Sequence, residues 1–331
     1  MATARHNVLV TSAGQRVSLI KSFMDELRSI YPDAKVYAAD LNPQLSPACH
    51  IADKAFKVPA VLCDAYIDTL IQLCIDHDIG LIVPTIDTEL LALSEHLARF
   101  QQHDIEVSIS DVAFIKRCRD KRQTNQLFVE NNITIPQQFD IRAGVASLAF
   151  PVFVKPCDGS LSKGIFLAQT ADDIRPEQLS DEKLMYMEYI SPKEYDEFTV
   201  DCYYDRQSVL RCVVPRQRLF VRAGEVNKAI TRKNIIIEHF FNNIANLAGA
   251  RGCLTIQVFL HKTNNSIKGI EINPRFGGGY PLTYLSGANY TKWLLEEYML
   301  DKAIATYHDW ENNLLMLRYD AEVLVHDNTQ R

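Results

Sequence analysis

The segment from Ile267 to Pro281, I-K-G-I-E-I-N-P-R-F-G-G-G-Y-P, carries side chains suited to phosphoryl transfer. Its alternating isoleucines predict a strand, which Pro274 and the following glycines end. Glu271 and Asn273 stand two residues apart, so a strand presents them on one face as two oxygen ligands of the kind that hold Mg²⁺ against phosphate. Arg275 adds a fixed cation beside them. An ordinary edge strand that ends in a turn would show the same pattern.

A second predicted strand, Cys253 to Leu260, precedes this segment and carries one polar residue, Gln257, among apolar neighbours. If the two strands form a hairpin with Gln257 opposite Glu271, the amide oxygen of Gln257 joins the metal-binding face. The sequence does not fix that register, because a shift by one residue moves every side chain to the other face.

Small residues dominate the loop from Asp158 to Gly164, which connects predicted strands at 150–155 and 164–168. The backbone amides of such a loop can wrap an anion, so the loop is a candidate cover for phosphate groups. It lacks the Walker spacing G-x-x-x-x-G-K-[ST], and a flexible hairpin loop is the alternative interpretation.

A cluster of cations follows the predicted antiparallel strands 197–204 and 209–214. Six fall within eighteen residues of a chain that is net acidic: Arg216, Arg218, Arg222, Lys228, Arg232 and Lys233. We expect this segment to be loop-like and to bind an anion, although such clusters usually form a solvated face. Guanidinium forks match carboxylate geometry better than lysine does, so Arg218 or Arg222 is the predicted contact for a substrate carboxylate.

Strands and helices alternate in the first third of the chain, which predicts a parallel sheet covered on both faces. The expected strands span 7–11, 35–39, 55–58, 81–83 and 107–109, with one helix at 89–100. Ligands bind at the carboxyl ends of such strands, where Gly14, Asp40 and Asp87 lie. One glycine falls far short of the G-x-G-x-x-G fingerprint, which argues against NAD. Asp87 and Glu89 fit either a substrate contact or charges that complement a helix N-terminus.

Bulk properties narrow the class of protein. With 331 residues, two or three packed units are expected, and the pattern changes near residue 112. A net charge of −6 argues against a general nucleic-acid binder. No apolar run is long enough for a membrane and the N-terminus lacks a signal-peptide core, so we expect a cytoplasmic protein. The eight scattered cysteines predict neither structural zinc nor a disulfide framework.

Seven motifs, taken in order, resemble those of the ATP-grasp superfamily. They are Lys121, V-K-P at 154–156, S-K-G at 162–164, M-E-Y-I at 187–190, E-F-T-V-D at 197–201, Gln257 and E-I-N-P-R at 271–275. The last two are most similar to the synthetase halves of the carbamoyl-phosphate synthetase large subunit and to related amide ligases. The resemblance implies an α/β and α+β architecture: an N-terminal parallel α/β domain at 1–112, then a grasp fold with a small subdomain at 113–187 and a C-terminal subdomain at 188–331.

The resemblance also implies roles for individual residues. ATP phosphates would contact Lys121, Lys155, Ser160, Ser162, Lys163 and Gly164. Glu188 by its side chain and Ile190 by its backbone would face adenine, and Glu197 would bind the ribose, with Glu194 as its competitor. Gln257, Glu271 and Asn273 would hold one or two Mg²⁺ ions, with Mn²⁺ as a substitute. Many relatives have a carboxylate where this chain has Gln257, which would weaken a second metal site. Arg275, Lys155 and Arg218 are the predicted catalytic residues.

The implied function is an ADP-forming, ATP-dependent carboxylate–amine ligase that works through an acyl phosphate. A carboxylate or carbamate kinase of the carbamoyl-phosphate type is the alternative, and a non-catalytic ATP-binding module is a third. The small-molecule substrates would meet between the first domain and the grasp unit, where Asp87 and Glu89 suit an ammonium group and Arg218 or Arg222 a carboxylate. One substrate would then be an amino acid or another ammonium-bearing molecule. Neither nucleic acid nor membrane is an expected partner, and a homodimer is compatible with this interpretation.

Overall fold

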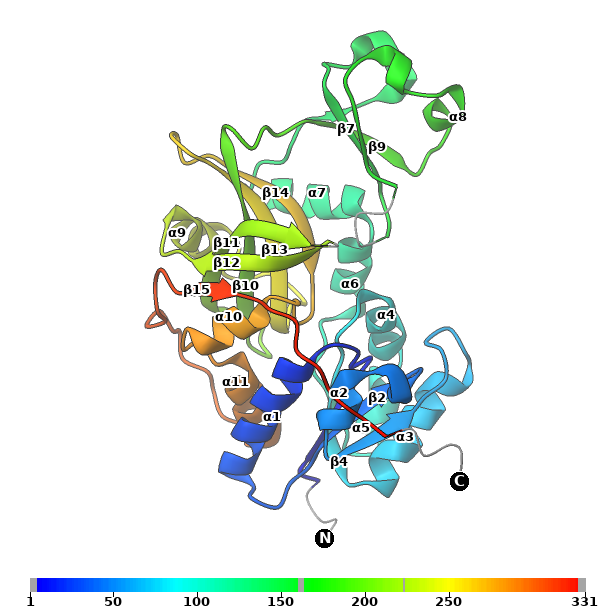
Figure 1. The fold of residues 1–331 in the computed structure, drawn as a ribbon, viewed down its shortest axis with the longest axis vertical. Coiled ribbons are helices and arrows are strands. Elements are labelled where there is room, and N and C mark those ends of the chain that lie inside the picture. The colour runs from blue at the N-terminus through cyan, green and yellow to red at the C-terminus, as the bar shows by residue number, and fades with distance from the viewer. Residues whose placement is uncertain (1–4, 160–163, 223, 327–331) are drawn as a thin grey trace.

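The computed structural model describes residues 5–159, 164–222 and 224–326, which form three β-sheets with flanking helices (Figure 1). Their strand orders are β3-β2-β1-β4-β5, β6-β9-β7-β8 and β14-β13-β10-β11-β12-β15. None of the helices described here is both long enough and apolar enough to cross a membrane.

The N-terminal domain is the expected parallel sheet with helices on both faces. Its elements are β1 (Asn7–Thr11), α1 (Val17–Ile30), β2 (Val36–Asp40), α2 (Pro47–Ile51), β3 (Lys54–Lys57), α3 (Ala65–Asp76), β4 (Ile79–Val83), α4 (Asp87–Glu95), α5 (Leu97–Gln101) and β5 (Glu106–Val107). The single helix expected at 89–100 is wrong. The chain leaves helical geometry at His96 (φ −109°, ψ 13°), and α4 begins two residues earlier, at Asp87.

Two helices, α6 (Val112–Arg119) and α7 (Lys121–Glu130), lead into the grasp fold. Phe114 and Phe128 belong to the same buried cluster as Val258 and Ile272 of the six-stranded sheet. Gly269 makes this packing possible, because a Cβ atom there would overlap the Phe128 ring. The helices after residue 112 therefore pack on the C-terminal subdomain, and not on the small subdomain to which the sequence assigned them.

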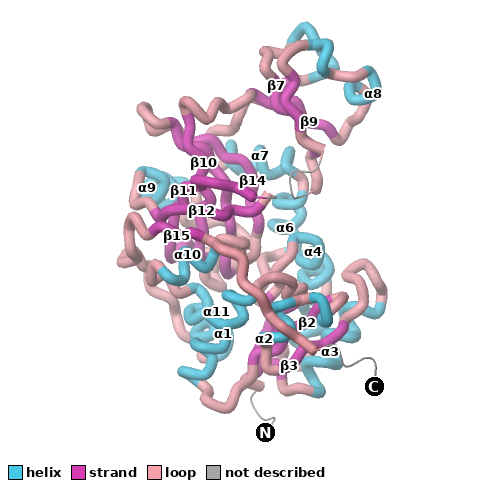
Figure 2. Tube along the Cα trace, in the orientation of Figure 1, coloured by secondary structure: helices cyan, strands magenta, loops and turns pink. Residues whose placement is uncertain are grey.

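The small subdomain contains β6 (Gln138–Phe139), β7 (Val152–Pro156), β8 (Phe166–Ala168), α8 (Pro176–Leu179) and β9 (Leu184–Glu188). Val152, Val154 and Tyr186 form a core of its own with Leu148 and Ile174. Loops join this unit to the rest of the molecule, from which it projects (Figures 1 and 2). Strand β9 runs through Glu188, one residue past the expected boundary.

The C-terminal subdomain is built on the six-stranded sheet. Its elements are β10 (Tyr195–Tyr204), β11 (Leu210–Arg222), β12 (Glu225–Thr231), α9 (Ile235–Asn243), β13 (Gly252–His261), β14 (Ile267–Asn273), α10 (Tyr280–Leu285), α11 (Tyr290–Met299) and β15 (Leu315–Leu317). The expectation of a loop at 216–233 is wrong, because β11 continues to Arg222 and pairs with β12 as a hairpin. Arg216 and Arg218 are consequently strand residues with side chains on one face.

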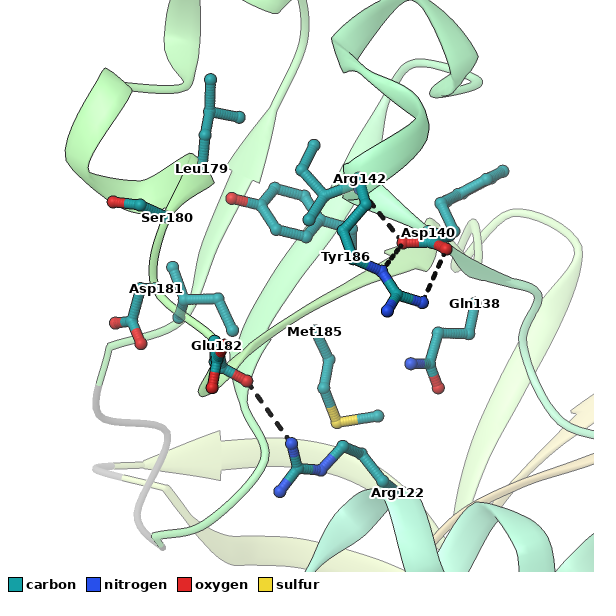
Figure 3. Close-up of a pocket in the computed structure, with 13 residues that line it drawn as sticks. Arg122, Gln138, Asp140, Arg142, Leu179, Ser180, Asp181, Glu182, Met185 and Tyr186 are labelled. Carbon is teal, nitrogen blue, oxygen red and sulfur yellow. Dashed lines mark hydrogen bonds and ion pairs between the residues drawn. The ribbon is translucent and has the colours of Figure 1, made fainter.

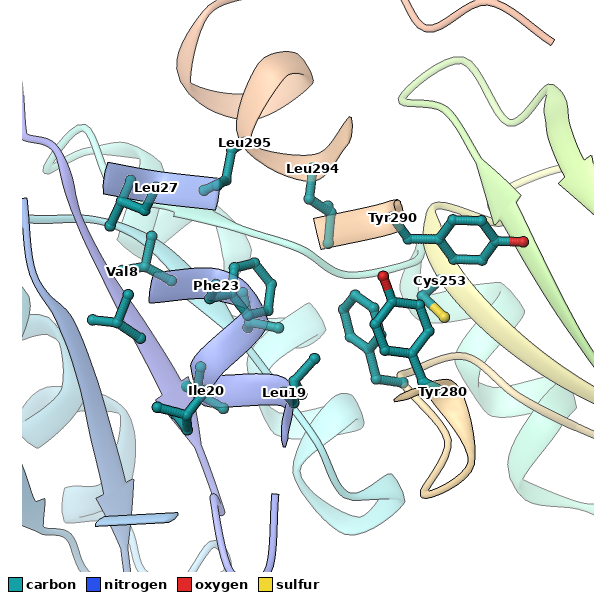
Figure 4. Close-up of a cluster of buried hydrophobic side chains, with 14 of the residues drawn as sticks. Val8, Leu19, Ile20, Phe23, Leu27, Cys253, Tyr280, Tyr290, Leu294 and Leu295 are labelled. Atoms are coloured by element: carbon teal, nitrogen blue, oxygen red, sulfur yellow. The ribbon is translucent and has the colours of Figure 1, made fainter. Parts of the chain in front are cut away.

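A continuous apolar core joins the N-terminal domain to the C-terminal subdomain (Figure 4). Phe23 and Leu27 of α1 pack there with Tyr280 and Tyr290, and Leu294 of α11 completes the contact. These two units therefore form one body, whereas the small subdomain has a separate core.

A buried ion pair anchors the face of the six-stranded sheet opposite the apolar cluster of Phe128 and Val258. Asp201 and Arg216 are both fully buried, and the guanidinium donates two hydrogen bonds of 2.9 Å to the carboxylate. Thr283 Oγ1 donates a further bond of 2.6 Å to Asp201. Arg216, one of the six predicted anion-binding cations, is thus already neutralised inside the protein.

We expect Asp201→Ala to lower the free energy of unfolding by about 3–5 kcal/mol, because it leaves the Arg216 charge buried without a partner. Urea unfolding measures this change. Arg222→Gln is the matched control, since Arg222 forms an exposed ion pair with Asp320 and its loss should cost about 1 kcal/mol or less. An Asp201→Ala protein as stable as the parent would show that the pair is not structural.

Candidate functional site

The hairpin of β13 and β14 brings the predicted metal ligands together. Gln257 pairs with Glu271, which settles the register that the sequence left open. Gln257 Nε2 donates to Glu271 Oε1 at 2.7 Å, and Asn273 Nδ2 donates to the same oxygen at 3.0 Å. The three side chains therefore share one face.

This donor set fits one hard cation. Both amide groups bond to Oε1 of Glu271, which leaves Glu271 Oε2 and the two amide oxygens for a metal ion. Oxygen atoms are the ligands that Mg²⁺ prefers, although it is usually bound through one or two carboxylates. In the described part of the chain no group of three acidic, histidine or cysteine residues could hold a metal. With one carboxylate, the set does not by itself provide for a second metal ion.

Two lysines lie near Glu271, in the region between the small and C-terminal subdomains that is termed the cleft. Lys155 of β7 is buried, and burial lowers the pKa of its ammonium to about 8, an effect that nearby Glu271 opposes and Lys121 reinforces. Lys121 Nζ donates to the backbone oxygen of Gly159 at 3.0 Å, at the start of the predicted phosphate loop. A phosphate group between these cations and Glu271 would need a bridging metal. Ser160, Ser162 and Lys163 lie outside the described residues, and Gly164 follows them with a positive φ of 72°.

The predicted ribose ligand faces the same cleft. Burial raises the pKa of the Glu197 carboxyl, which Arg218 opposes and Glu271 reinforces. Arg218 Nε lies 3.2 Å from Glu197 Oε1, and Arg218 Nη1 donates to Thr199 Oγ1 at 3.3 Å. Arg218 thus lies beside Glu197, the predicted ribose ligand. Glu194, the competing candidate, is exposed.

The predicted adenine contacts lie where the small subdomain joins the C-terminal subdomain. Lys268 of β14 donates to both oxygens of Glu188, at 2.8 and 2.6 Å, and so ties β9 to the six-stranded sheet. The backbone amide of Gln137 also donates to Glu188. Among the residues that the structure describes, none accepts a hydrogen bond from the backbone N–H of Ile190, which is available to a ligand.

Arg275 connects this cleft to the N-terminal domain. Its Nη2 lies 2.7 Å from Asp87 Oδ2 at the start of α4. Asp87 therefore lies beside Arg275, and its carboxylate is already paired. Glu89 is fully buried and accepts hydrogen bonds from Ser12, Tyr66 and two backbone amides at the start of α4. Glu89 therefore has a structural role at the N-terminus of α4, which agrees with the second of the two interpretations offered above. Neither of its carboxylate oxygens is left for a substrate.

Arg16, which was not singled out from the sequence, lies near Arg275, and Arg318 and Glu225 lie near Arg16. Arg16 follows β1, and burial lowers the pKa of its guanidinium to about 10, with Arg275 the next largest cause. Arg318 Nη1 lies 3.4 Å from Glu225 Oε2. Only Arg16 had a sequence signal, since it closes the loop at the carboxyl end of the first strand. Arg222, by contrast, points away to Asp320 in an exposed pair, so the structure does not support its predicted carboxylate contact.

The glycines of the F-G-G-G-Y turn permit close approach of these groups. A Cβ atom at Gly277 would crowd Thr255, and one at Gly279 would overlap the Arg216 guanidinium. At Gly278 a Cβ atom would lie 3.2 Å from Arg16 Nη1 and 3.3 Å from Glu225 Oε2. At Gly278 and Gly279 the turn thus lies directly against charged side chains.

A pocket of about 640 Å³ opens in the small subdomain, lined by residues of α7, β6 and β9 (Figure 3). Met185 and Arg122 border it near α7, and the Asp140–Arg142 ion pair crosses the opposite side. Its lining contains none of the predicted nucleotide, metal or substrate residues. It is therefore distinct from the site described above.

Comparisons with known proteins agree with this arrangement. Residues 8–108 match the model of the PylC-like N-terminal domain, and residues 180–317 match the model described as ATP-grasp in the biosynthetic pathway with Ter operon. No curated protein sequence matches the chain.

Solved structures with low sequence identity share the fold. The biotin carboxylase domain of Hydrogenobacter thermophilus 2-oxoglutarate carboxylase, crystallised with MgADP and bicarbonate, is 15% identical, with a TM-score of 0.72 over 95% of this chain and 74% of that one. N5-carboxyaminoimidazole synthetase from Staphylococcus aureus, with ADP, is 15% identical, with a TM-score of 0.68 over 88% and 77%. L-Amino acid ligase from Bacillus licheniformis is 15% identical, with a TM-score of 0.66 over 90% and 75%. Residues 180–317 therefore match an ATP-grasp family, and the chain as a whole shares the fold of these solved structures.

Proposed function

We propose that this protein is an ATP-dependent, ADP-forming ligase that joins a carboxylate to an amine through an acyl phosphate. The observation that carries the proposal is the convergence of buried Lys155 from the small subdomain on Glu271 of the C-terminal subdomain, with Arg275 at the inner end of the same face. This set matches the needs of phosphoryl transfer, which requires positioning and charge neutralisation but little covalent chemistry from the protein.

Each residue has a distinct task in this proposal. Lys155 and Lys121 would bind the phosphates, Ile190 and Glu188 would face adenine, and Glu197 would hold the ribose. Gln257, Glu271 and Asn273 would hold Mg²⁺, which when bound would neutralise phosphate charge. Arg275 would stabilise the charge that develops on the transferred phosphoryl group.

Two balanced steps follow. A carboxylate oxygen of the acid attacks the γ-phosphorus of ATP, and the bond from that phosphorus to the β,γ-bridging oxygen breaks, which gives an acyl phosphate and ADP. The amine nitrogen then attacks the acyl carbon, the C–O bond to phosphate breaks, and the nitrogen loses a proton. Inside the closed cleft, water is kept from the acyl phosphate, which would otherwise hydrolyse.

The solved neighbours support a reaction of this class. Those crystallised with ADP or MgADP are a biotin carboxylase domain and N5-carboxyaminoimidazole synthetase, and another neighbour is an L-amino acid ligase. We therefore also propose that one of the substrates is an amino acid. Its ammonium group would lie away from Asp87, which Arg275 occupies.

Hydroxylamine as a surrogate amine tests the reaction without knowledge of the natural amine. With a panel of carboxylic acids, ATP and Mg²⁺, we expect ADP and an acyl hydroxamate in equal amounts. Glu271→Ala should lower both rates by about a hundredfold or more, since it removes the one charged metal ligand. Gln257→Glu should instead shift the Mg²⁺ concentration that gives half-maximal rate. The melting temperature of each variant provides the control for folding.

ADP without hydroxamate would indicate a phosphatase or a kinase for another acceptor. No ADP release with any acid would indicate a binding module, and an unchanged rate in Glu271→Ala would contradict the metal assignment.

Lys155→Ala should weaken ATP binding by about ten- to a hundredfold, the effect of losing a hydrogen bond from a charged group. The parent should also bind ATP less tightly as pH rises above about 8. The pKa of Lys155 is lowered to about 8, so the ammonium is charged below that pH and loses its proton above it, whereas bound phosphate favours the charged form. Lys155→Arg should flatten this dependence, because a guanidinium remains charged.

Titration calorimetry between about pH 7 and 9.5 measures both effects, with the exposed Lys116→Ala as control. Equal affinity in Lys155→Ala and the parent would make Lys155 a structural residue of β7.

A further inference from the structure

The guanidinium of Arg16 stands between two ion pairs and belongs to neither. On one side Arg275 pairs with Asp87 at 2.7 Å, and on the other Arg318 pairs with Glu225 at 3.4 Å. Arg16 Nη1 and Glu225 Oε2 lie 3.2 and 3.3 Å from the position that a Cβ atom of Gly278 would take. Burial lowers the pKa of the Arg16 guanidinium, and the charges of all four residues also act on it. Among the described residues, none accepts a hydrogen bond from the Arg16 side chain or forms an ion pair with it.

The cluster has an excess of positive charge. Three guanidinium groups face two carboxylates, which leaves one charge uncompensated in a place from which much of the water is excluded. Holding such a charge away from water without a partner is unfavourable, and an anion bound there would remove the penalty. The folded protein thus carries a cation whose environment is complete only with an anionic ligand.

The glycine-rich turn approaches Arg16 closely. Gly278 lies against the guanidinium, and any side chain there would come within 3.2 Å of Arg16 Nη1. The parts come from separate regions: the loop before α1, the glycine-rich turn and the segment after β15, which runs back toward the N-terminal domain (Figure 1). They meet beside Arg275, at the N-terminal-domain end of the sheet face that carries Gln257, Glu271 and Asn273.

We propose that Arg16 binds the carboxylate of the acid substrate and presents it beside Arg275 for phosphorylation. This inference rests on the proposed ligase function, and it assigns the anion contact to the N-terminal domain instead of to the β11–β12 hairpin. Asp87 and Glu225 are already neutralised, so this end of the site accepts an anion and not an ammonium group. A guanidinium also offers the planar fork that a carboxylate fits.

The phosphate groups of ATP are the other anions that could reach Arg16. A guanidinium binds phosphate and carboxylate groups alike, so the experiment must distinguish the phosphates of ATP from the carboxylate of the acid substrate. Acetate and succinate serve as carboxylate probes, inorganic phosphate as the phosphate probe, and sodium chloride at equal ionic strength as the control for screening.

Thermal melting of the full chain without ATP tests the assignment. We expect succinate or acetate to raise the melting temperature of the parent in a saturable manner. Arg16→Gln should raise the half-saturating concentration by about ten- to a hundredfold, and Arg16→Lys should fall between the two because it keeps the charge without the fork. Arg99→Gln, which removes an exposed arginine paired with Asp68 in the same domain, should behave as the parent does.

Two further readouts separate binding from structure. Without ligand, Arg16→Gln should melt no lower than the parent, because its loss relieves repulsion from Arg275 and Arg318. Calorimetry should show the same ATP affinity in both proteins. A fall of several degrees in melting temperature would make Arg16 structural, and weaker ATP binding or a response to phosphate alone would place it in the nucleotide site.

A parent protein that no carboxylate stabilises would also overturn the assignment. Because the melting assay contains no ATP, its result does not depend on ligase activity, and a failed hydroxamate screen would contradict the proposed function alone.

Discussion

A charge held away from water needs a partner, and the polar face of the six-stranded sheet is arranged around that requirement. Asp201 and Arg216 neutralise each other through two hydrogen bonds and fix β10 against β11. Nearer the cleft, the buried charges are only partly compensated by neighbouring charges. Glu197 lies beside Arg218, Arg275 lies beside Asp87, and Lys155 lies near Glu271. A site that binds phosphates, a metal ion and an anionic substrate needs buried charged groups that are not fully paired within the protein.

The packing divides the molecule into a fixed part and a separate part. The shared core of α1, α10 and α11 holds the N-terminal domain on the C-terminal subdomain, so Arg16, Asp87 and Arg275 keep their positions relative to the predicted metal ligands. The small subdomain has its own core and brings Lys155 to the cleft from the opposite side. The Glu188–Lys268 pair joins the two parts beside the predicted adenine contacts. Because the two parts have separate cores, a nucleotide bound between them would contact both and connect them.

Strand periodicity made much of the site predictable. Glu271 and Asn273 lie on one face because they are two residues apart in an alternating strand, and Gln257 joins them because β13 and β14 are a hairpin. The parallel N-terminal sheet followed from the alternation of strands and helices. These features depend on local pattern, which a sequence displays directly.

Contacts between distant segments could not be predicted in the same way. The cations at 216–233 were expected in a loop, yet strand β11 continues through Arg222, and the partner that neutralises Arg216 is Asp201 on the neighbouring strand β10. Nothing local marks Asp87 as the partner of Arg275, or Arg318 as a neighbour of Arg16, because each pair is far apart in the chain. Phe114 and Phe128 likewise lie within the range assigned to the small subdomain but pack on β13 and β14.

Isotope transfer tests the central claim most directly. An accepted acid labelled with ¹⁸O in its carboxylate is incubated with ATP, Mg²⁺ and an amine, and the inorganic phosphate is analysed by mass spectrometry. Transfer through an acyl phosphate predicts one labelled oxygen in each phosphate formed, in step with the amide product. Amide formation accompanied by unlabelled phosphate would contradict the account.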